Sequence, residues 1–518
     1  MNIYRLSKIF CADSANWVTS KLNKGSIFLV FFLIISCKQQ TLNDGDYLII
    51  SASSGKTLGV VEGDLGGNDP VLEHDRTDLA TINKIWMFKR FGDANYTIVS
   101  KQTGKALTVF QGSPENNSPI EQADLVFSDA QQFKIATAYP NASGLFTLMN
   151  QGSGKVISLR EGNLEQRPYL LNKSQQWRIE PFLHDTEALL SIYEDCPSSK
   201  SDKINYISRD SNFPNKGYIN PKNSKGAFTP TAKRHEQGVS ALLNALYLGQ
   251  YHSAYQIATS PDALNLRACK MLDDKKRPLL VYKAVENQTP RSAYINLLWR
   301  VQGANNLILE SPHSGSDGGV SFASMRIFYY SSAQAMIMNE QDRHSSNIRS
   351  GCNGNSGSYG ISDVAHAPTS LFHFSHKLLS QLYPTALIAN LHGMGKSGNG
   401  ISISNGLGYS SSVKKDSAIA HFTDIFLQHE AFMSGSRTDF TACQKGTGFT
   451  RKQRVCGTTN IQGRHLNGSK NECTERGKID SDRFLHVEQG AYIRGNQARQ
   501  KALAEVFDNM VDTWGSPN

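Results

Sequence analysis

The 518-residue sequence lacks the features that mark several large classes of protein. No internal run of eighteen apolar residues occurs, which predicts a soluble body without a membrane-spanning helix. Charged residues make up only 19%, the net charge is +9, and no long Lys/Arg block lies outside the N-terminus, which argues against a nucleic-acid partner. Neither G-x-G-x-x-G nor G-x-x-x-x-G-K-[ST] stands between a strand and a helix, so we predict no nucleotide site.

The N-terminal segment has the pattern of an export signal. Lys21 and Lys24 precede the apolar run 27–35, which ends in a serine and Cys37. Basic, then apolar, then small residues are typical of a signal peptide. The ending resembles a bacterial lipobox, so we interpret residues 1–37 as a signal peptide with a lipidated cysteine. The implied location is the bacterial cell envelope, lipid-anchored at an outer-membrane, periplasmic or surface face. A plain signal peptide is the alternative.

Export places the chain in an oxidising compartment, where disulfides persist. Six cysteines remain beyond the two N-terminal ones, and this even number predicts up to three disulfides. The sequence does not choose among the fifteen pairings that six cysteines allow. Because Cys443, Cys456 and Cys473 lie in one loop-rich stretch, we expect at least one local bridge. No C-x-x-C pair is present, so a thiolate metal site is not expected.

Residues 44–182 contain three copies of one pattern. Each copy has an alternating apolar strand, a Ser/Thr-Gly-Lys turn and a closing aromatic residue. Three such units cannot bury their faces singly, but they can share one core. The pattern resembles the ricin-type β-trefoil family, whose repeats close with Q-x-W, and the resemblance implies an all-β trefoil. The turn glycines are Gly55, Gly104 and Gly154, and the closing aromatics are Trp86, Phe133 and Trp177.

The trefoil resemblance also implies a carbohydrate-binding module. Family members often carry an acidic residue near the turn, whereas Gly59, Thr108 and Ser158 stand at the comparable positions. We expect Trp86 and Trp177 to plug the core rather than to stack on sugars. A structural or protein-docking module is therefore the alternative to a glycan-binding one.

From about residue 186 the sequence changes to helical segments and longer apolar strands. Their alternation indicates an α/β domain over residues 186–518, with a mixed, largely parallel sheet. The Ser-, Asn- and Gly-rich segments 186–230 and 440–480 are predicted to be loops or insertions. Helices are predicted over 235–256, 370–382 and 497–514, and strands over 279–283, 293–299, 307–310, 386–392 and 484–488.

Polar side chains gather at the ends of three predicted strands, where ligands collect in open α/β sheets. Imidazole and carboxylate groups suit zinc, and a carboxylate beside a metal can take a proton from water. Residues two apart on a strand share a face. The three clusters are His313 with Asp317, Asn390 with His392, and His486 with Glu488.

The order of a P-H-S-G loop, a strand ending in L-H-G and an H-V-E strand resembles the N-formylglutamate amidohydrolase-like hydrolases, which are distantly similar to zinc carboxypeptidases. The resemblance covers roughly residues 300–500. It implies that His313, Asp317 and His392 hold zinc and that Glu488 is the general base. The spacing is H-x-x-x-D rather than H-x-x-E, so Glu310 is an alternative to Asp317 as a ligand.

Further residues receive supporting roles. The family's D-L-H-S is N-L-H-G here, which leaves the partner of His392 open; Asn390, His486 and Asp363 are candidates for supporting the metal ligands. Arg343 and Arg494 are candidates to bind a substrate carboxylate or to stabilise the oxyanion. His373 and His376 share a helix face and are expected to have no acidic companion, so they are interpreted as packing or surface residues.

Two functions remain open at the level of sequence. The first is an exported, lipid-anchored, zinc-dependent hydrolase that cleaves an amide bond in a peptide, a peptidoglycan stem or an N-acyl amino acid. Its trefoil would hold it near a cell-surface or extracellular glycan or peptide polymer. The second is a non-catalytic surface lectin or adhesin with a degenerate hydrolase domain.

Overall fold

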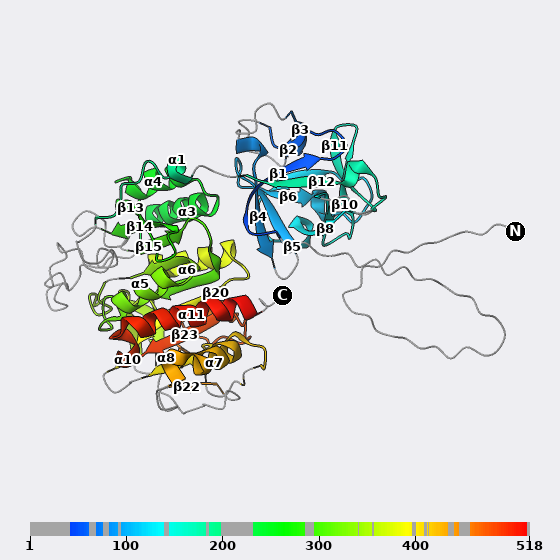
Figure 1. The fold of residues 1–518 in the computed structure, drawn as a ribbon. Helices are drawn as coiled ribbons and strands as arrows, with labels where there is room; N and C mark the ends of the chain where they lie inside the picture. The colour runs from blue at the N-terminus through cyan, green and yellow to red at the C-terminus, as the bar shows by residue number, and fades with distance from the viewer. Residues whose placement is uncertain are drawn as a thin grey trace, which may run out of the picture. The chain divides into compact units, whose positions relative to one another are not determined.

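The computed structural model divides the chain into two compact units, Met1–Leu183 and His184–Asn518 (Figure 1). The predicted signal peptide and its Cys37 lie outside the residues that the structure describes. Within the described residues, no helix has the length and apolar character needed to cross a membrane. The described residues are 42–61, 69–75, 82–91, 95–138, 144–182, 186–197, 231–284, 295–339, 341–354, 357–395, 400–408, 412, 414–433, 440–444 and 456–514.

The first unit is built on a closed ring of antiparallel strands. β1 pairs with β4, β4 with β5, β5 with β8, β8 with β9, β9 with β12, and β12 returns to β1. One hairpin from each sequence repeat adds to the ring, so the predicted all-β trefoil is confirmed. The ring strands are β1 (Gly45–Ser51), β4 (Trp86–Phe91), β5 (Asn95–Ser100), β8 (Gln132–Thr137), β9 (Phe146–Asn150) and β12 (Trp177–Pro181). The hairpins are β2 (Thr57–Gly59) with β3 (Leu72–His74), β6 (Ala106–Val109) with β7 (Ile120–Ala123), and β10 (Val156–Arg160) with β11 (Asn163–Arg167).

The closing aromatics of the three repeats fill the centre of this unit. Trp86, Phe133 and Trp177 are fully buried in one apolar cluster. The indole N–H of Trp86 donates to the carbonyl of Leu58 at 3.0 Å, so the ring leaves no buried donor unpaired. The tryptophans are therefore core residues and not stacking surfaces for sugars.

The three Gly-Lys turns explain why glycine recurs every repeat. Gly55, Gly104 and Gly154 have φ values of +74°, +72° and +66°, in the left-handed region that glycine adopts without steric cost. Each glycine N–H donates at 2.9 Å to the carbonyl four residues earlier, which closes the turn. The repeat detected in the sequence is thus a repeat of backbone geometry.

The second unit contains a nine-stranded mixed sheet. Its central strands β17, β16, β20 and β23 run parallel, while β13, β14 and β15 form an antiparallel flank. The predicted mixed, largely parallel α/β sheet is confirmed. In spatial order the strands are β13 (Leu266–Leu272), β14 (Pro278–Ala284), β15 (Asn296–Arg300), β17 (Ala333–Met338), β16 (Asn305–Ser311), β20 (Leu387–Gly393), β23 (Phe484–Gln489), β21 (Ile401–Ser404) and β22 (Phe440–Ala442). A separate hairpin joins β18 (Arg349–Gly354) and β19 (Gly357–Gly360).

Helices cover this sheet. The predicted helix 235–256 is two helices, because Gly249 between them has a φ of +67° that ends the first. The segment 440–480, predicted to be loop, contains a short strand and α9, whose N-terminus is capped by the side chain of Asn460. The helices are α1 (Thr186–Leu189), α3 (Lys233–Tyr247), α4 (Tyr251–Thr259), α5 (Val320–Tyr330), α6 (Leu371–Leu382), α7 (Ala418–Gln428), α8 (Glu430–Met433), α9 (Ile461–Leu466), α10 (Ala491–Arg494) and α11 (Gln497–Thr513).

Strand alternation separates an apolar face of the sheet from a polar one. On one face, Leu307 and Leu309 of β16 join the apolar core with Phe328 of α5, Phe422 of α7 and Phe507 of α11. The residues between them along each strand point to the opposite face, beside α6. In the central strands this second face carries polar side chains in register: Glu310 opposite Asn390, Asn390 opposite His486, and His392 opposite Glu488.

Three disulfides are formed: Cys196–Cys269, Cys352–Cys473 and Cys443–Cys456. The last confirms the expected local bridge, since its cysteines are 13 positions apart. The other two join segments 73 and 121 positions apart. Because disulfides persist in oxidising compartments, they indicate an extracytoplasmic protein.

Candidate metal centre

The structure brings His313, Asp317 and His392 together at the carboxyl ends of β16 and β20. Their potential ligand atoms lie within 4.8 Å of one another. The Nδ1 atoms of His313 and His392 are 3.2 Å apart, and Oδ2 of Asp317 is 3.9 Å from Nδ1 of His313. A tight turn places Asp317, whose Oδ2 also accepts the N–H of Gly393 at 3.0 Å. The turn after one strand is thereby tied to the end of the next.

The hydrogen bonds of the two imidazoles decide which nitrogens are free to bind a cation. Nε2 of His313 lies 2.8 Å from Oδ1 of Asp363, and Nε2 of His392 lies 2.5 Å from Oδ1 of Asn390. Both partners are acceptors, so both Nε2 atoms carry the proton and both Nδ1 atoms present lone pairs. Nη1 of Arg343 lies 3.3 Å from Nδ1 of His313, consistent with that assignment.

Two lone pairs facing each other across 3.2 Å leave a gap that a cation fits. A proton is a poor occupant, because burial and the neighbouring His486 and His313 lower the pKa of His392 well below its usual value. A metal ion is a better one, since two neutral imidazoles and a carboxylate are a frequent zinc-binding set. The residues present therefore fit a divalent metal ion of the zinc type.

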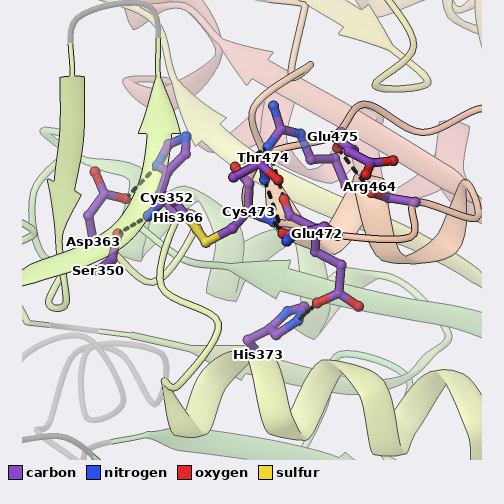
Figure 2. The surroundings of a disulfide bond; sticks show 12 residues. Ser350, Cys352, Asp363, His366, His373, Arg464, Glu472, Cys473, Thr474 and Glu475 are labelled. Carbon is purple, nitrogen blue, oxygen red and sulfur yellow. Dashed lines mark hydrogen bonds and ion pairs between the residues drawn. A yellow bond between two sulfur atoms is a disulfide. The ribbon is translucent and has the colours of Figure 1, made fainter.

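Asp363 is shared between two histidines. Its Oδ1 accepts from Nε2 of His313 at 2.8 Å. The same oxygen accepts from Nδ1 of His366 at 2.9 Å (Figure 2). Burial opposes ionisation of this carboxyl, but the two hydrogen bonds outweigh burial and lower its pKa below the usual value. His366 stacks on Tyr359, with ring centroids 3.7 Å apart. An ionised Asp363 thus fixes the orientation of His313 from behind.

Glu488 stands beside the cluster on β23, in register with His392. The residue is 6% exposed, and burial, followed by repulsion from Asp317, raises the pKa of its carboxyl to about 8. Arg343 and Arg494 oppose that rise. A carboxyl with a raised pKa next to a candidate metal group is the environment expected of a general base.

The two predicted arginines occupy different environments. Arg343 is 36% exposed, and its Nη1 lies 3.8 Å from Oδ1 of Asp317, at the edge of the cluster. Arg494 is held by main-chain atoms, because its Nη1 donates to the carbonyls of Met394, at 2.9 Å, and Gln489. Arg343 is therefore the better placed of the two to reach a substrate, while Arg494 braces the ends of β20 and β23.

His486 offers a second way to complete a metal site. Its ring stacks on His392 with centroids 4.4 Å apart, and its Nε2 is 3.7 Å from Oε1 of Glu488. His392, His486 and Glu488 form another group with ligand atoms within 4.8 Å of one another. Burial and then His313 and His366 lower the pKa of His486 to about 3, so the ring is neutral. Its Nδ1 is buried with no hydrogen-bond partner among the described residues.

Glu310 does not stand with these ligands. It bonds to His376 and Asn390 and belongs to none of the metal-ligand groups found among the described residues, so Asp317 is the carboxylate beside His313 and His392. The view that His373 and His376 lack acidic companions is wrong. His373 contacts Glu472, 99 positions away (Figure 2). His376 contacts Glu310, and both histidines are fully buried. The sequence did not indicate the pairs His373–Glu472 and His376–Glu310 because their members lie far apart along the chain.

Disulfides hold the loops around the cluster. Cys352–Cys473 joins the hairpin that precedes Asp363 and His366 to the loop that carries Glu472 (Figure 2). Cys456, bonded to Cys443, is followed by Gly457, which lies so close to His486 that an added Cβ would be 2.7 Å from the ring. These loops were not predicted to approach the site. Their paired cysteines were the only sequence signal that they are anchored.

One family model matches residues of the first unit. Residues 32–123 match the family model described as ricin-type beta-trefoil lectin domain-like, so this unit contains a lectin-type trefoil. The designed 3-fold symmetric protein ThreeFoil is 26% identical, over 27% of this chain and 100% of its own, with a TM-score of 0.25. The Macrolepiota procera ricin B-like lectin, solved with lactose, is 15% identical, over 28% of this chain and 100% of its own, with a TM-score of 0.24. An exo-beta-1,3-galactanase from Clostridium thermocellum is 20% identical, over 27% of this chain and 31% of its own, with a TM-score of 0.25. No curated protein matches the chain.

The raised pKa of Glu488 predicts how the metal-free protein responds to pH. Between its usual pKa of 4.5 and about 8, the folded state binds a proton that the unfolded state has lost. Raising the pH through this window therefore lowers the free energy of unfolding. Because glutamine cannot ionise, we expect metal-free Glu488→Gln to be more stable than wild type by about 5 kcal/mol at pH 9 and nearly equal to it at pH 4.5.

Urea denaturation of both proteins with chelator present, at the two pH values, measures this difference. A difference in the free energy of unfolding between variant and wild type that stays constant with pH would contradict the raised pKa of Glu488.

Proposed function

We propose that this protein is an exported, zinc-dependent hydrolase of amide bonds, similar to the N-formylglutamate amidohydrolase-like hydrolases. The observation that carries the proposal is the pair of facing Nδ1 lone pairs on His313 and His392, with Asp317 and Glu488 beside them. His313, Asp317 and His392 would hold the zinc ion. Bound zinc would polarise the substrate carbonyl and lower the pKa of water towards about 7.

Glu488 acts as the base in this proposal. Its carboxylate takes a proton from the attacking water as the water oxygen bonds to the carbonyl carbon. It then returns the proton to the leaving nitrogen as the C–N bond breaks. A dication nearby favours the ionised form of a carboxyl whose pKa is raised by burial, so metal binding and activation of the base are linked.

Arg343 and Asp363 support the reaction. The guanidinium of Arg343, partly exposed at the edge of the cluster, donates hydrogen bonds to the oxyanion or to a substrate carboxylate. Asp363 keeps the proton of His313 on Nε2, which leaves Nδ1 for the metal. The substrate class is a peptide, a peptidoglycan stem or an N-acyl amino acid.

The first unit and the N-terminal segment give the enzyme its location. A lectin-type trefoil supports binding to a cell-surface or extracellular glycan. Lipidation at Cys37 would anchor the chain to the cell envelope. The trefoil would then concentrate the hydrolase on the polymer that carries its substrate.

Metal analysis of the purified protein is the direct test. We expect about one zinc ion per chain after zinc supplementation and dialysis, together with hydrolysis of amide substrates that stops when a chelator removes the metal. A folded, zinc-supplemented protein that retains no metal would contradict the proposal.

A non-catalytic surface lectin is the second candidate, favoured by the trefoil match. A glycan array distinguishes a sugar-binding trefoil from one that acts only as a spacer. Binding to a sugar, together with absence of metal in the second unit, would support the lectin; absence of any sugar binding would leave the trefoil as a spacer.

A further inference from the structure

A buried row of polar residues behind the candidate metal centre has no part in the proposed reaction. Glu310 of β16 stands opposite Asn390 of β20, and His376 of α6 covers Glu310. The side chains of Glu310 and His376 are fully buried. Nδ1 of His376 lies 2.8 Å from Oε1 of Glu310, and Nδ2 of Asn390 donates to Oε2 of Glu310 at 3.0 Å. The row continues to His392, whose Nε2 is 2.5 Å from Oδ1 of Asn390.

The contacts of Asn390 leave its amide only one orientation. Nδ2 of Asn390 lies 3.0 Å from Oε2 of Glu310, so the NH2 group of Asn390 faces Glu310 and donates to it. The amide oxygen must then face His392. Nδ2 of Asn460 donates to the same oxygen at 3.3 Å, which supports this orientation.

The orientation of this amide sets the protonation of the metal ligand. With the oxygen of Asn390 facing it, Nε2 of His392 donates, and Nδ1 keeps its lone pair. A reversed amide would present NH2 to Nε2, which would then have to accept. The proton would move to Nδ1, and His392 could no longer bind a metal through that atom.

We propose that Glu310 is a positioning residue that selects the metal-binding tautomer of His392 by fixing the Asn390 amide, with His376 holding the carboxylate in place. The inference rests on the proposed metal centre. It accounts for a buried carboxylate one strand away from His392. A carboxylate at position 390 would do the same task directly, but beside Glu310 it would bring two negative charges within hydrogen-bond distance.

The experiment exchanges the carboxylate at position 310 and the amide at position 390. In Glu310→Gln the side chain offers both donor and acceptor atoms, so the Asn390 amide can turn. We expect zinc affinity, measured by competition with a chelator, to fall by about 10- to 100-fold. Asn390→Asp alone should also bind weakly, because it pairs two buried carboxylates. The double variant Glu310→Gln/Asn390→Asp places one carboxylate against Nε2 of His392 and should recover wild-type affinity.

Glu472→Gln is the matched control. Like Glu310, Glu472 contacts a buried histidine of α6, His373, at 2.7 Å (Figure 2). It also contacts His465 at 2.6 Å, but it has no bond to Asn390 among the described contacts. We expect its zinc affinity to match that of wild type. Nitrogen NMR of labelled histidine in the metal-free protein provides a second measurement, with the proton on Nε2 of His392 in wild type and divided between the nitrogens in Glu310→Gln.

The outcomes are distinct. Absence of zinc from folded wild type overturns the metal centre and this inference with it. Zinc binding by wild type that is unchanged in Glu310→Gln overturns the role of Glu310 and leaves the proposed function intact. If Glu310→Gln fails to fold, the double variant decides: recovered affinity supports the exchange, and a folded double variant that binds zinc weakly overturns it.

Discussion

Glu488→Gln is expected to lower turnover about 10³-fold while the protein keeps its zinc, because glutamine cannot accept the proton of the attacking water. The carboxyl is in register with His392 but belongs to a different strand from the three predicted ligands. Glutamine preserves its size and polarity, so the fold and the ligand positions should persist. Steady-state rates and metal content of the same preparation measure the two effects together.

A matched control for this variant is Glu475→Gln, an exposed carboxylate of the same unit that pairs with Lys478. It should keep full activity. Unchanged activity in Glu488→Gln would remove the proposed base. Loss of zinc from Glu488→Gln would instead assign Glu488 to the metal ligands, with His392 and His486.

His392→Ala is expected to abolish metal binding, with a fall in affinity greater than the roughly 100-fold upper end seen for outer partners of a ligand. His392 is the residue that the two candidate ligand groups around Glu488 and Asp317 have in common. Its loss removes one nitrogen and leaves the other ligands too few to fill a zinc site. Activity should disappear with the metal.

Variants of the two neighbouring histidines then separate the candidate ligand groups. If His313 and Asp317 complete the site, His313→Ala loses the metal and His486→Ala retains it. The reverse result would place the metal between His392, His486 and Glu488. His344→Ala is the control, because His344 is an exposed histidine next to Arg343. Metal that survives in His392→Ala would contradict both arrangements.

The trefoil was predictable because its determinants are local. Each Gly-Lys turn requires a glycine with positive φ, and each repeat buries its closing aromatic residue in a shared core. The same three-residue signals recur at a regular spacing, so the repeat and its fold follow together. The burial of Trp86 and Trp177 also agrees with the expectation from sequence.

The candidate metal centre was only partly predictable. Alternation along β20 and β23 indicated that Asn390 shares a face with His392, and His486 with Glu488. The partner of His392 was left open, and the structure places Asn390 against it. The partner of Asn390 itself, Glu310, lies 80 positions away and becomes its neighbour only through the pairing of β16 with β20. Local spacing suggested Glu310 as a ligand, and strand register instead puts it behind the ligands.

The histidines of α6 show the same limit. His373 and His376 have no acid near them in sequence, yet each meets a buried or half-buried carboxylate contributed by a distant segment. The loop around Cys473, which the composition marked as an insertion, supplies Glu472 to one of them (Figure 2). Composition describes how a segment behaves alone, whereas its partners depend on where disulfides and packing place it.

The sequence by itself determined the class of each unit, the polar strand ends and the even cysteine count, because turns, alternation and residue chemistry act over a few neighbouring positions. The tertiary structure alone decided which nitrogen of each histidine is free, which carboxylate joins the ligands and which cysteines pair. Most of those properties depend on contacts between distant segments, such as the hydrogen bond of His313 with Asp363, 50 positions apart, and the disulfide of Cys352 with Cys473, 121 positions apart. Only the closing of the sheet and its covering helices brings such segments together.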